Sequence, residues 1–98
     1  MLPLFSSFKL HAHERKDSAI RNMHSQNYQW AIKSFIFALL LHPDDGSKMK
    51  FKRSVESHLA SAYFNIKQYK KAVDVGKESY KSNPDFRSKV RDNINYLN

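Results

Sequence analysis

Five histidines are the side chains of this 98-residue chain with the widest chemical range. They are His11, His13, His24, His42 and His58. A metal site needs several ligands at defined spacing, but His11 and His13 have only Glu14 beside them, and the chain has no cysteine. Many serines are present, yet no G-x-S-x-G motif marks a nucleophile, and no Gly-rich phosphate loop occurs. We therefore expect a binding module with no catalytic residue, metal or cofactor.

Lysine and arginine give the chain a formal net charge of +8. The basic clusters are Lys48/Lys50/Lys52/Arg53, Lys67/Lys70/Lys71, Lys77/Lys81 and Arg87/Lys89/Arg91. Such a surface favours acidic partners, nucleic acids or anionic membranes. Nucleic-acid binding also needs exposed aromatic rings among the charges, whereas Tyr63, Tyr69 and Tyr80 fall at positions typical of a core. We expect mainly a solvated helical surface, with weak electrostatic nucleic-acid binding as a third functional class.

The spacing of apolar residues predicts an all-α chain. Helices are expected over residues 14–25, 28–42, 48–66, 69–82 and 86–97, where apolar residues recur every three to four positions. Pro43 ends the second helix, and Ser47 is a candidate N-cap of the third. Residues 1–13 lack periodicity and are expected to form an N-terminal arm. The longest apolar run, Phe35–Leu41, is far shorter than the about 20 residues that span a bilayer.

The two halves of the chain repeat one pattern 41 residues apart. Matching pairs are Tyr28/Tyr69, Ala31/Ala72, Ile32/Val73 and Pro43/Pro84. This pattern resembles the tetratricopeptide repeat, in which helical hairpins stack to bury faces that a single hairpin leaves open. The resemblance implies antiparallel hairpins: a first repeat over 14–43, a second over 48–84, and a capping helix over 86–97, together forming one domain over 14–98. Because that repeat is about 34 residues long, the connection over 43–50 is lengthened.

A closer resemblance is to the peptide-substrate-binding domain of the collagen prolyl 4-hydroxylase α subunit and to the helical domains of the leprecan group. It rests on Tyr28, Ala38-Leu39, Leu59, Phe64, Ala72, Pro84, Asn93 and Tyr96. The resemblance implies a groove that binds a proline-rich peptide. It does not imply the hydroxylase reaction, because no H-x-D motif with a distant histidine is present to bind iron.

The peptide-binding residues expected from the resemblance and from the third helix are Ser57, His58, Ser61, Asn65, Asn93 and Tyr96. A small polar strip suits the N–H and C=O groups of an extended peptide. The family's acid and two tyrosines fall at Ser57, His58 and Ser61, and losing two rings should weaken or redirect proline binding. A merely solvated polar face is the alternative interpretation of this strip.

Other partners remain open. A cytosolic scaffold or co-chaperone adaptor is the runner-up function, since tetratricopeptide proteins can grip a carboxylate with basic and asparagine side chains. Lys16 stands at the lysine position of such a clamp, but Ile20 and His58 replace asparagines. The expected location is the cytoplasm if the chain is complete, and the endoplasmic reticulum lumen if it is a hydroxylase fragment.

An extra apolar stripe on the second helix stands where tetratricopeptide helices are normally polar. It consists of Trp30, Ile36, Phe37 and Leu40. An exposed stripe of this size would act as a docking or aggregation surface. We expect the N-terminal arm, with Leu2, Leu4, Phe5 and Phe8, to fold back over it. Self-association or contact with a further domain is the alternative.

Overall fold

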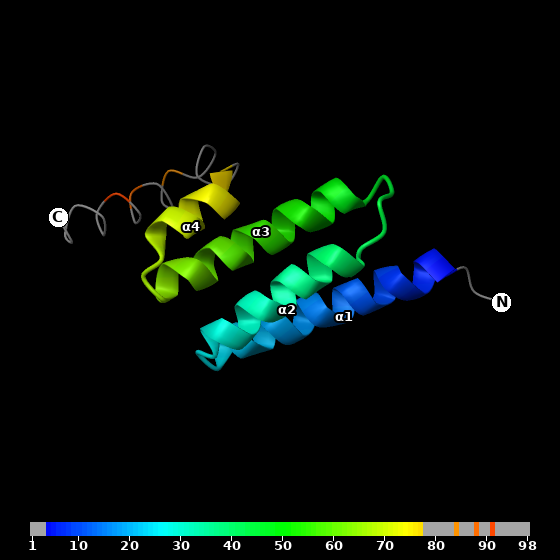
Figure 1. Ribbon diagram of the computed structural model, residues 1–98, viewed down its shortest axis with the longest axis horizontal. Coiled ribbons are helices and arrows are strands. Elements are labelled where there is room, and N and C mark those ends of the chain that lie inside the picture. Colours follow the sequence, from blue (N-terminus) through cyan, green and yellow to red (C-terminus); the bar gives the residue numbers. More distant parts are fainter. Residues whose placement is uncertain (1–3, 78–83, 85–87, 89–90, 92–98) are drawn as a thin grey trace.

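The computed structural model describes residues 4–77 together with residues 84, 88 and 91, and this part of the chain contains no strand. Four helices follow one another: α1 (Leu4–His24), α2 (Tyr28–Leu41), α3 (Lys48–Asn65) and α4 (Tyr69–Val75) (Figure 1). α1 and α2 form one antiparallel hairpin, α3 and α4 a second, and α2 packs against α3. The predicted all-α architecture of helical hairpins is confirmed. None of the four helices has the length and apolarity needed to cross a bilayer.

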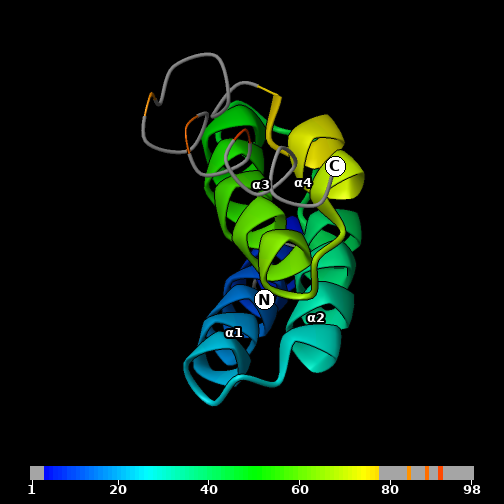
Figure 2. The same ribbon diagram turned by 90° about the vertical axis from the view of Figure 1, so that its left-hand side faces the viewer.

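The end-on view separates the helices into two sides. α1 and α3 lie on one side and α2 and α4 on the other (Figure 2). α1 contacts α3 only sparsely, while α2 contacts both of its sequence neighbours extensively. Because α1 and α3 are not tightly packed together, side chains from both can border the same open surface.

The first helix begins ten residues earlier than predicted, at Leu4 instead of Glu14. The predicted N-terminal arm is therefore wrong for residues 4–13, which continue α1 without a break. This segment contains no glycine or proline to interrupt a helix, and Ala12 is fully buried in the core. Phe8 and Leu10 remain exposed, although Leu4, Phe5, Phe8 and Ala12 recur at the three-to-four-residue spacing of a helix.

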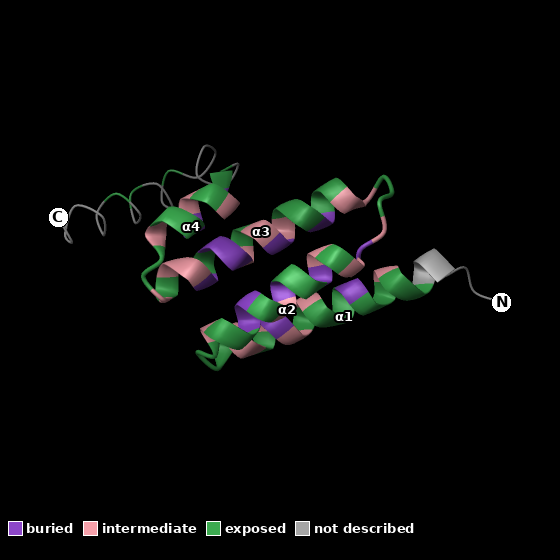
Figure 3. Cartoon of the chain, viewed as in Figure 1, coloured by how far each residue is buried: buried purple, intermediate pink, exposed green. Residues whose placement is uncertain are grey.

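The core lies between the inner faces of the helices (Figure 3). Small residues allow α1 and α2 to approach closely, and they are fully buried: Ala12, Ala19, Ala31 and Ala38. Phe35 and Val55 are the largest side chains with no exposed surface. The apolar spacing of the sequence predicts two buried stripes, one with Ala31 and Phe35 in residues 28–42 and one with Val55 and Leu59 in residues 48–66. All four residues are buried, so the predicted inner faces of α2 and α3 are confirmed.

The turns inside the two hairpins have the same backbone conformation. Gln26 (φ 63°) and Lys67 (φ 65°) are both left-handed, and in each turn the next N–H donates to a carbonyl five residues back. These bonds run from Asn27 N to Asn22 O at 2.7 Å and from Gln68 N to Tyr63 O at 2.9 Å. Both turns thus close their helix with the same cap, at positions that correspond in the sequence pattern.

The last predicted elements extend past the described residues. α4 starts at Tyr69 as predicted and is described to Val75. The helix predicted over 69–82 is interrupted earlier than expected, because Gly76 forms the C-cap of α4 and glycine favours helix ends. Residues 78–82 and most of the helix predicted over 86–97 lie outside the described part of the chain. The expected capping helix stays a prediction.

Candidate functional site

A pocket of about 320 Å³ lies where α1, the end of α2 and the start of α3 meet. It is lined by Lys9, His13, Lys16, His42, Ser47, Lys50, Phe51 and Ser54. We call it the basic pocket, because its lining includes three lysines and two histidines and no acidic side chain. α1 supplies Lys9, His13 and Lys16 at spacings of four and three, which place all three on one helix face.

Phe51 provides the apolar part of the pocket and is only 5% exposed. Its ring centroid lies 4.9 Å from that of His13, edge to face, and 4.3 Å from that of His42. Lys16 Nζ sits over the same ring, 5.8 Å from its centroid. A cation over an aromatic face is attracted by the ring's quadrupole. Phe51 therefore joins α1 to the end of α2 and holds a charge at the pocket wall.

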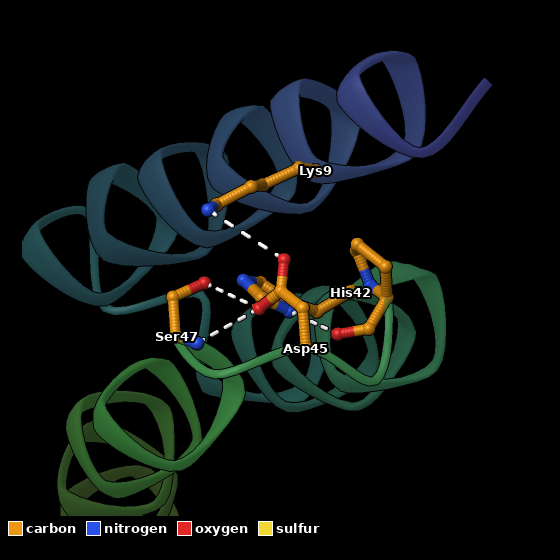
Figure 4. Close-up of polar contacts among 5 residues, drawn as sticks. Lys9, His42, Asp45 and Ser47 are labelled. Atoms are coloured by element: carbon orange, nitrogen blue, oxygen red, sulfur yellow. Dashed lines mark hydrogen bonds and ion pairs between the residues drawn. The ribbon is translucent and has the colours of Figure 1, made fainter. Parts of the chain in front are cut away.

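The connection between α2 and α3 is held by Asp45 (Figure 4). The N–H and the hydroxyl of Ser47 both donate to Asp45 Oδ1, at 2.8 and 2.6 Å. Lys9 Nζ lies 3.7 Å from Asp45 Oδ2, in an exposed ion pair. The hydrogen bonds from the Ser47 hydroxyl and then from its N–H lower the pKa of Asp45. Asp45 thus partly neutralises the charge of Lys9. It also holds the connection between α2 and α3 in one conformation through its bonds to Ser47.

Ser47 occupies the N-cap position of α3 as predicted, but its side chain makes no capping hydrogen bond. Its hydroxyl donates to Asp45 instead of accepting from the first turn of the helix. The carboxylate of Asp45 is a strong, charged acceptor two residues away, and donation to it orients the Ser47 side chain toward the connection. The expected capping bond is therefore replaced by a bond within the connection.

His42 is 2% exposed and has one nitrogen without a partner among the described residues. Its Nδ1 donates to the carbonyl of Pro43 at 2.8 Å, so in the neutral ring Nε2 is an acceptor. Buried polar atoms nearly always have a hydrogen-bond partner. The Nε2 of His42 is therefore a buried polar atom without a partner among the described residues, behind the lining of the basic pocket.

The pKa of His13 is lowered from its ordinary value. The largest cause of the lowered pKa is partial desolvation, and the next is repulsion from His42, Lys16 and Lys9. Attraction to Asp17 raises the pKa. The side chain is largely exposed, but its ring packs against Phe51 and His42. The lysines of the basic pocket disfavour the charged form of His13, and an anion placed among them would favour its protonation.

The predicted peptide-binding residues of α3 lie elsewhere. Ser57, Ser61 and Asn65 are exposed, and Asn65 Nδ2 donates to the Ser61 carbonyl at 2.8 Å. His58 is half-buried: its Nδ1 donates to the Ser54 carbonyl at 2.9 Å, and its ring centroid is 5.7 Å from that of Phe35. None of these four residues lines the basic pocket. Asn93 and Tyr96 lie outside the described residues.

Sequence reasoning missed most of the basic pocket. The sequence places Lys50 in the basic cluster Lys48/Lys50/Lys52/Arg53 and Lys16 at one position of a carboxylate clamp, while Lys9 and His13 fall in the expected N-terminal arm. Extending the first helix across residues 4–13 would have placed Lys9, His13 and Lys16 on one face. The approach of Lys50 and Phe51 to that face required the tertiary structure.

No protein-family model, curated protein or solved structure is significantly similar to this chain. Within the described residues, no three His, Asp or Glu side chains are grouped so that they could hold a metal ion. The functional argument therefore rests on the geometry and charge of the basic pocket.

Proposed function

We propose that the chain is a protein-interaction module that binds an acidic segment of a partner protein in the basic pocket. The observation that carries the proposal is the convergence of Lys9, Lys16 and Lys50 from two helices around the buried ring of Phe51. Carboxylates placed among these ammonium groups would gain charge-assisted hydrogen bonds.

A peptide segment suits the remaining features of the pocket. The pocket lining includes the hydroxyls of Ser47 and Ser54 beside the lysines, and a peptide supplies N–H and C=O groups as well as carboxylates. The volume of about 320 Å³ is at the small end of ligand sites and suits one or two side chains. The matching hairpin turns, at Gln26 and Lys67, support the view that this is a tetratricopeptide-like scaffold.

An acidic ligand fits better than a proline-rich one. Proline recognition depends on exposed aromatic surfaces on which the rings stack. The strip at Ser57, Ser61 and Asn65 offers none, and Phe51 is almost fully enclosed. We therefore favour an adaptor-like module over a substrate domain of the prolyl hydroxylase type.

The test is fluorescence anisotropy with three labelled peptides of equal length: one rich in Asp and Glu, its Asn and Gln counterpart, and a Pro-Pro-Gly repeat. We expect saturable binding of the acidic peptide alone. Replacing Lys16 and Lys50 together by Gln should weaken it about fivefold, if each exposed ion pair contributes about 0.5 kcal/mol. Lys52→Gln is the matched control, because Lys52 is an exposed lysine of α3 outside the basic pocket.

Equal binding of the acidic and amide peptides would contradict the proposal. So would an equal loss of affinity in the Lys52 control. A single-stranded RNA is included as a competitor. RNA binding that is tighter than peptide binding, and that falls steeply with salt through counterion release, would move the assignment to nucleic acid.

A further inference from the structure

The outer side of α2 carries large apolar side chains that nothing in the described chain covers. Trp30 is 63% exposed and Leu40 is 76% exposed, and Ile36 and Phe37 are also exposed. We call these four residues the α2 outer face. The expectation that the N-terminal segment folds back over them is not met by the described residues 4–13, which run straight on as part of α1.

Basic side chains hold defined positions among these rings. The guanidinium carbon of Arg15 lies 5.0 Å from the ring centroid of Phe37, and Lys33 Nζ lies 4.9 Å from that of Trp30. Arg15, Trp30, Lys33, Ser34 and Phe37 line a second pocket of about 320 Å³. The charged residues of this pocket are both basic, so an apolar hollow lies between two fixed cations.

We propose that the α2 outer face is a second docking surface, which binds an acidic amphipathic helix of a partner protein. Trp30, Lys33, Phe37 and Leu40 are spaced by three or four residues and therefore form one stripe along α2. A partner helix with apolar residues at matching intervals would cover this stripe. Its acidic residues would pair with Arg15 and Lys33, which are exposed and lie over the rings of Phe37 and Trp30.

Charge argues for this occupant over a second copy of the chain. A symmetric contact through the α2 outer face would bring Arg15 and Lys33 of both copies together, and each copy carries a formal net charge of +8. An anionic membrane surface would also attract the positive charges of Arg15 and Lys33. However, a membrane favours apolar groups that insert, whereas Trp30 and Phe37 border a hollow of side-chain size.

This surface is separate from the basic pocket. The two linings share no residue, although Arg15 and Lys16 are neighbours on α1. Arg15 reaches the ring of Phe37 in α2, while Lys16 reaches the ring of Phe51 in α3. The second surface would therefore remain if the basic pocket proved to bind nothing.

Trp30 is the one tryptophan of the chain, so its fluorescence reports directly on this face. The probe is a helix-forming peptide of about 16 residues, with Leu at positions three and four apart and Glu on the flanks. We expect a saturable blue shift of the emission of the full chain. Two control peptides, one with Lys for every Glu and one with Ser for every Leu, should cause no shift.

Leu40→Ser should weaken peptide binding about tenfold, because a Leu side chain buried at an interface contributes on the order of 1.5 kcal/mol. Leu40 is so exposed that the fold should tolerate the change, and circular dichroism of the variant checks this. Met49→Ser is the matched control: Met49 is an exposed apolar residue of α3 outside this face. Arg15→Glu should also weaken binding.

Four results would overturn the proposal. The first is no shift with peptide at about 0.5 mM, and the second is equal binding of the Lys peptide. The third is a dimer in sedimentation that Leu40→Ser makes monomeric, which would assign the face to a second copy. The fourth is a shift with phosphatidylserine vesicles and none with the peptide. If the Lys16/Lys50 double variant loses peptide binding and Leu40→Ser keeps it, the peptide occupies the basic pocket instead.

Discussion

His42 and Phe51 pack ring against ring, with centroids 4.3 Å apart and planes inclined by 30°. His42 directly follows α2, and Phe51 lies in the first turn of α3. Their contact closes the connection between the two hairpins, and the ring of His13 adds α1 to the same cluster. The basic pocket is therefore built on an aromatic cluster that also joins three helices.

Phe51→Ala should destabilise the protein by about 3 kcal/mol, because removing a buried aromatic ring costs transfer free energy and leaves a cavity. Phe37→Ala is the control, since Phe37 is exposed on α2, and it should cost less than about 1 kcal/mol. Urea unfolding followed by circular dichroism measures both. Equal losses would mean that the cluster at Phe51 does not hold the helices together.

Gln26→Gly and Lys67→Gly should each stabilise the protein by about 0.5 kcal/mol. Both residues have a left-handed backbone at a helix end, which glycine adopts without steric cost; the larger entropy of the unfolded glycine chain offsets part of the gain. Gln29→Gly, at an exposed position in the first turn of α2, should instead destabilise by about 0.5 kcal/mol. Melting temperatures that fall for all three variants would contradict this.

Acidic-peptide binding should strengthen as the pH falls from about 7.5 to about 5.5. The pKa of His13 is lowered in the free protein, and a bound carboxylate would raise it again, so binding takes up a proton. The peptide's own carboxylates stay ionised over this range. His13 is faced by Lys9, Lys16 and Asp17 of α1, by His42, and by Phe51 of α3, with Lys50 in the same pocket lining.

The measurement is the dissociation constant against pH for the unaltered chain, His13→Gln and His24→Gln. His13→Gln should flatten the profile, while His24→Gln, at an exposed position at the end of α1, should keep it. The folding stability of the free protein should change with pH in the opposite direction to the binding affinity. The neutral form of His13 is favoured by folding, so stability is fully present above pH about 6.5 and declines as the pH falls through the lower folded pKa. A pH-independent affinity would contradict the assignment of His13 to the site.

Ala38→Leu should destabilise the protein by about 1–3 kcal/mol, because a larger side chain cannot enter a close-packed core without strain. Ala38 is fully buried in the core, on the inner face of α2. Gln29→Leu places the same side chain at an exposed position of α2 and should change stability by no more than about 0.5 kcal/mol. Thermal unfolding distinguishes the two, and an unchanged Ala38→Leu variant would mean that α1 and α2 are more loosely packed.

Local pattern was sufficient for much of the fold. The apolar spacing in residues 28–42 and 48–66 predicted α2 and α3 to within one residue at each end, and Pro43 separated them. The α2 outer face was also visible, because four large apolar residues stood outside the buried stripe. Each of these features depends on residues close together in the chain, so its signal is present in a short window of sequence.

The sequence by itself thus determined the helical class, the limits of α2 and α3, and the residues that face the core, since helix periodicity is a local property. Only the tertiary structure decided how residues 4–13 pack. Leu4, Phe5, Phe8 and Ala12 recur at helical spacing, but that Ala12 is buried in the core while Phe8 stays exposed depends on the neighbouring helices. The basic pocket was also decided by the tertiary structure. Lys9, His42 and Lys50 belong to separate segments, and only packing around Phe51 brings their charges and polar atoms together.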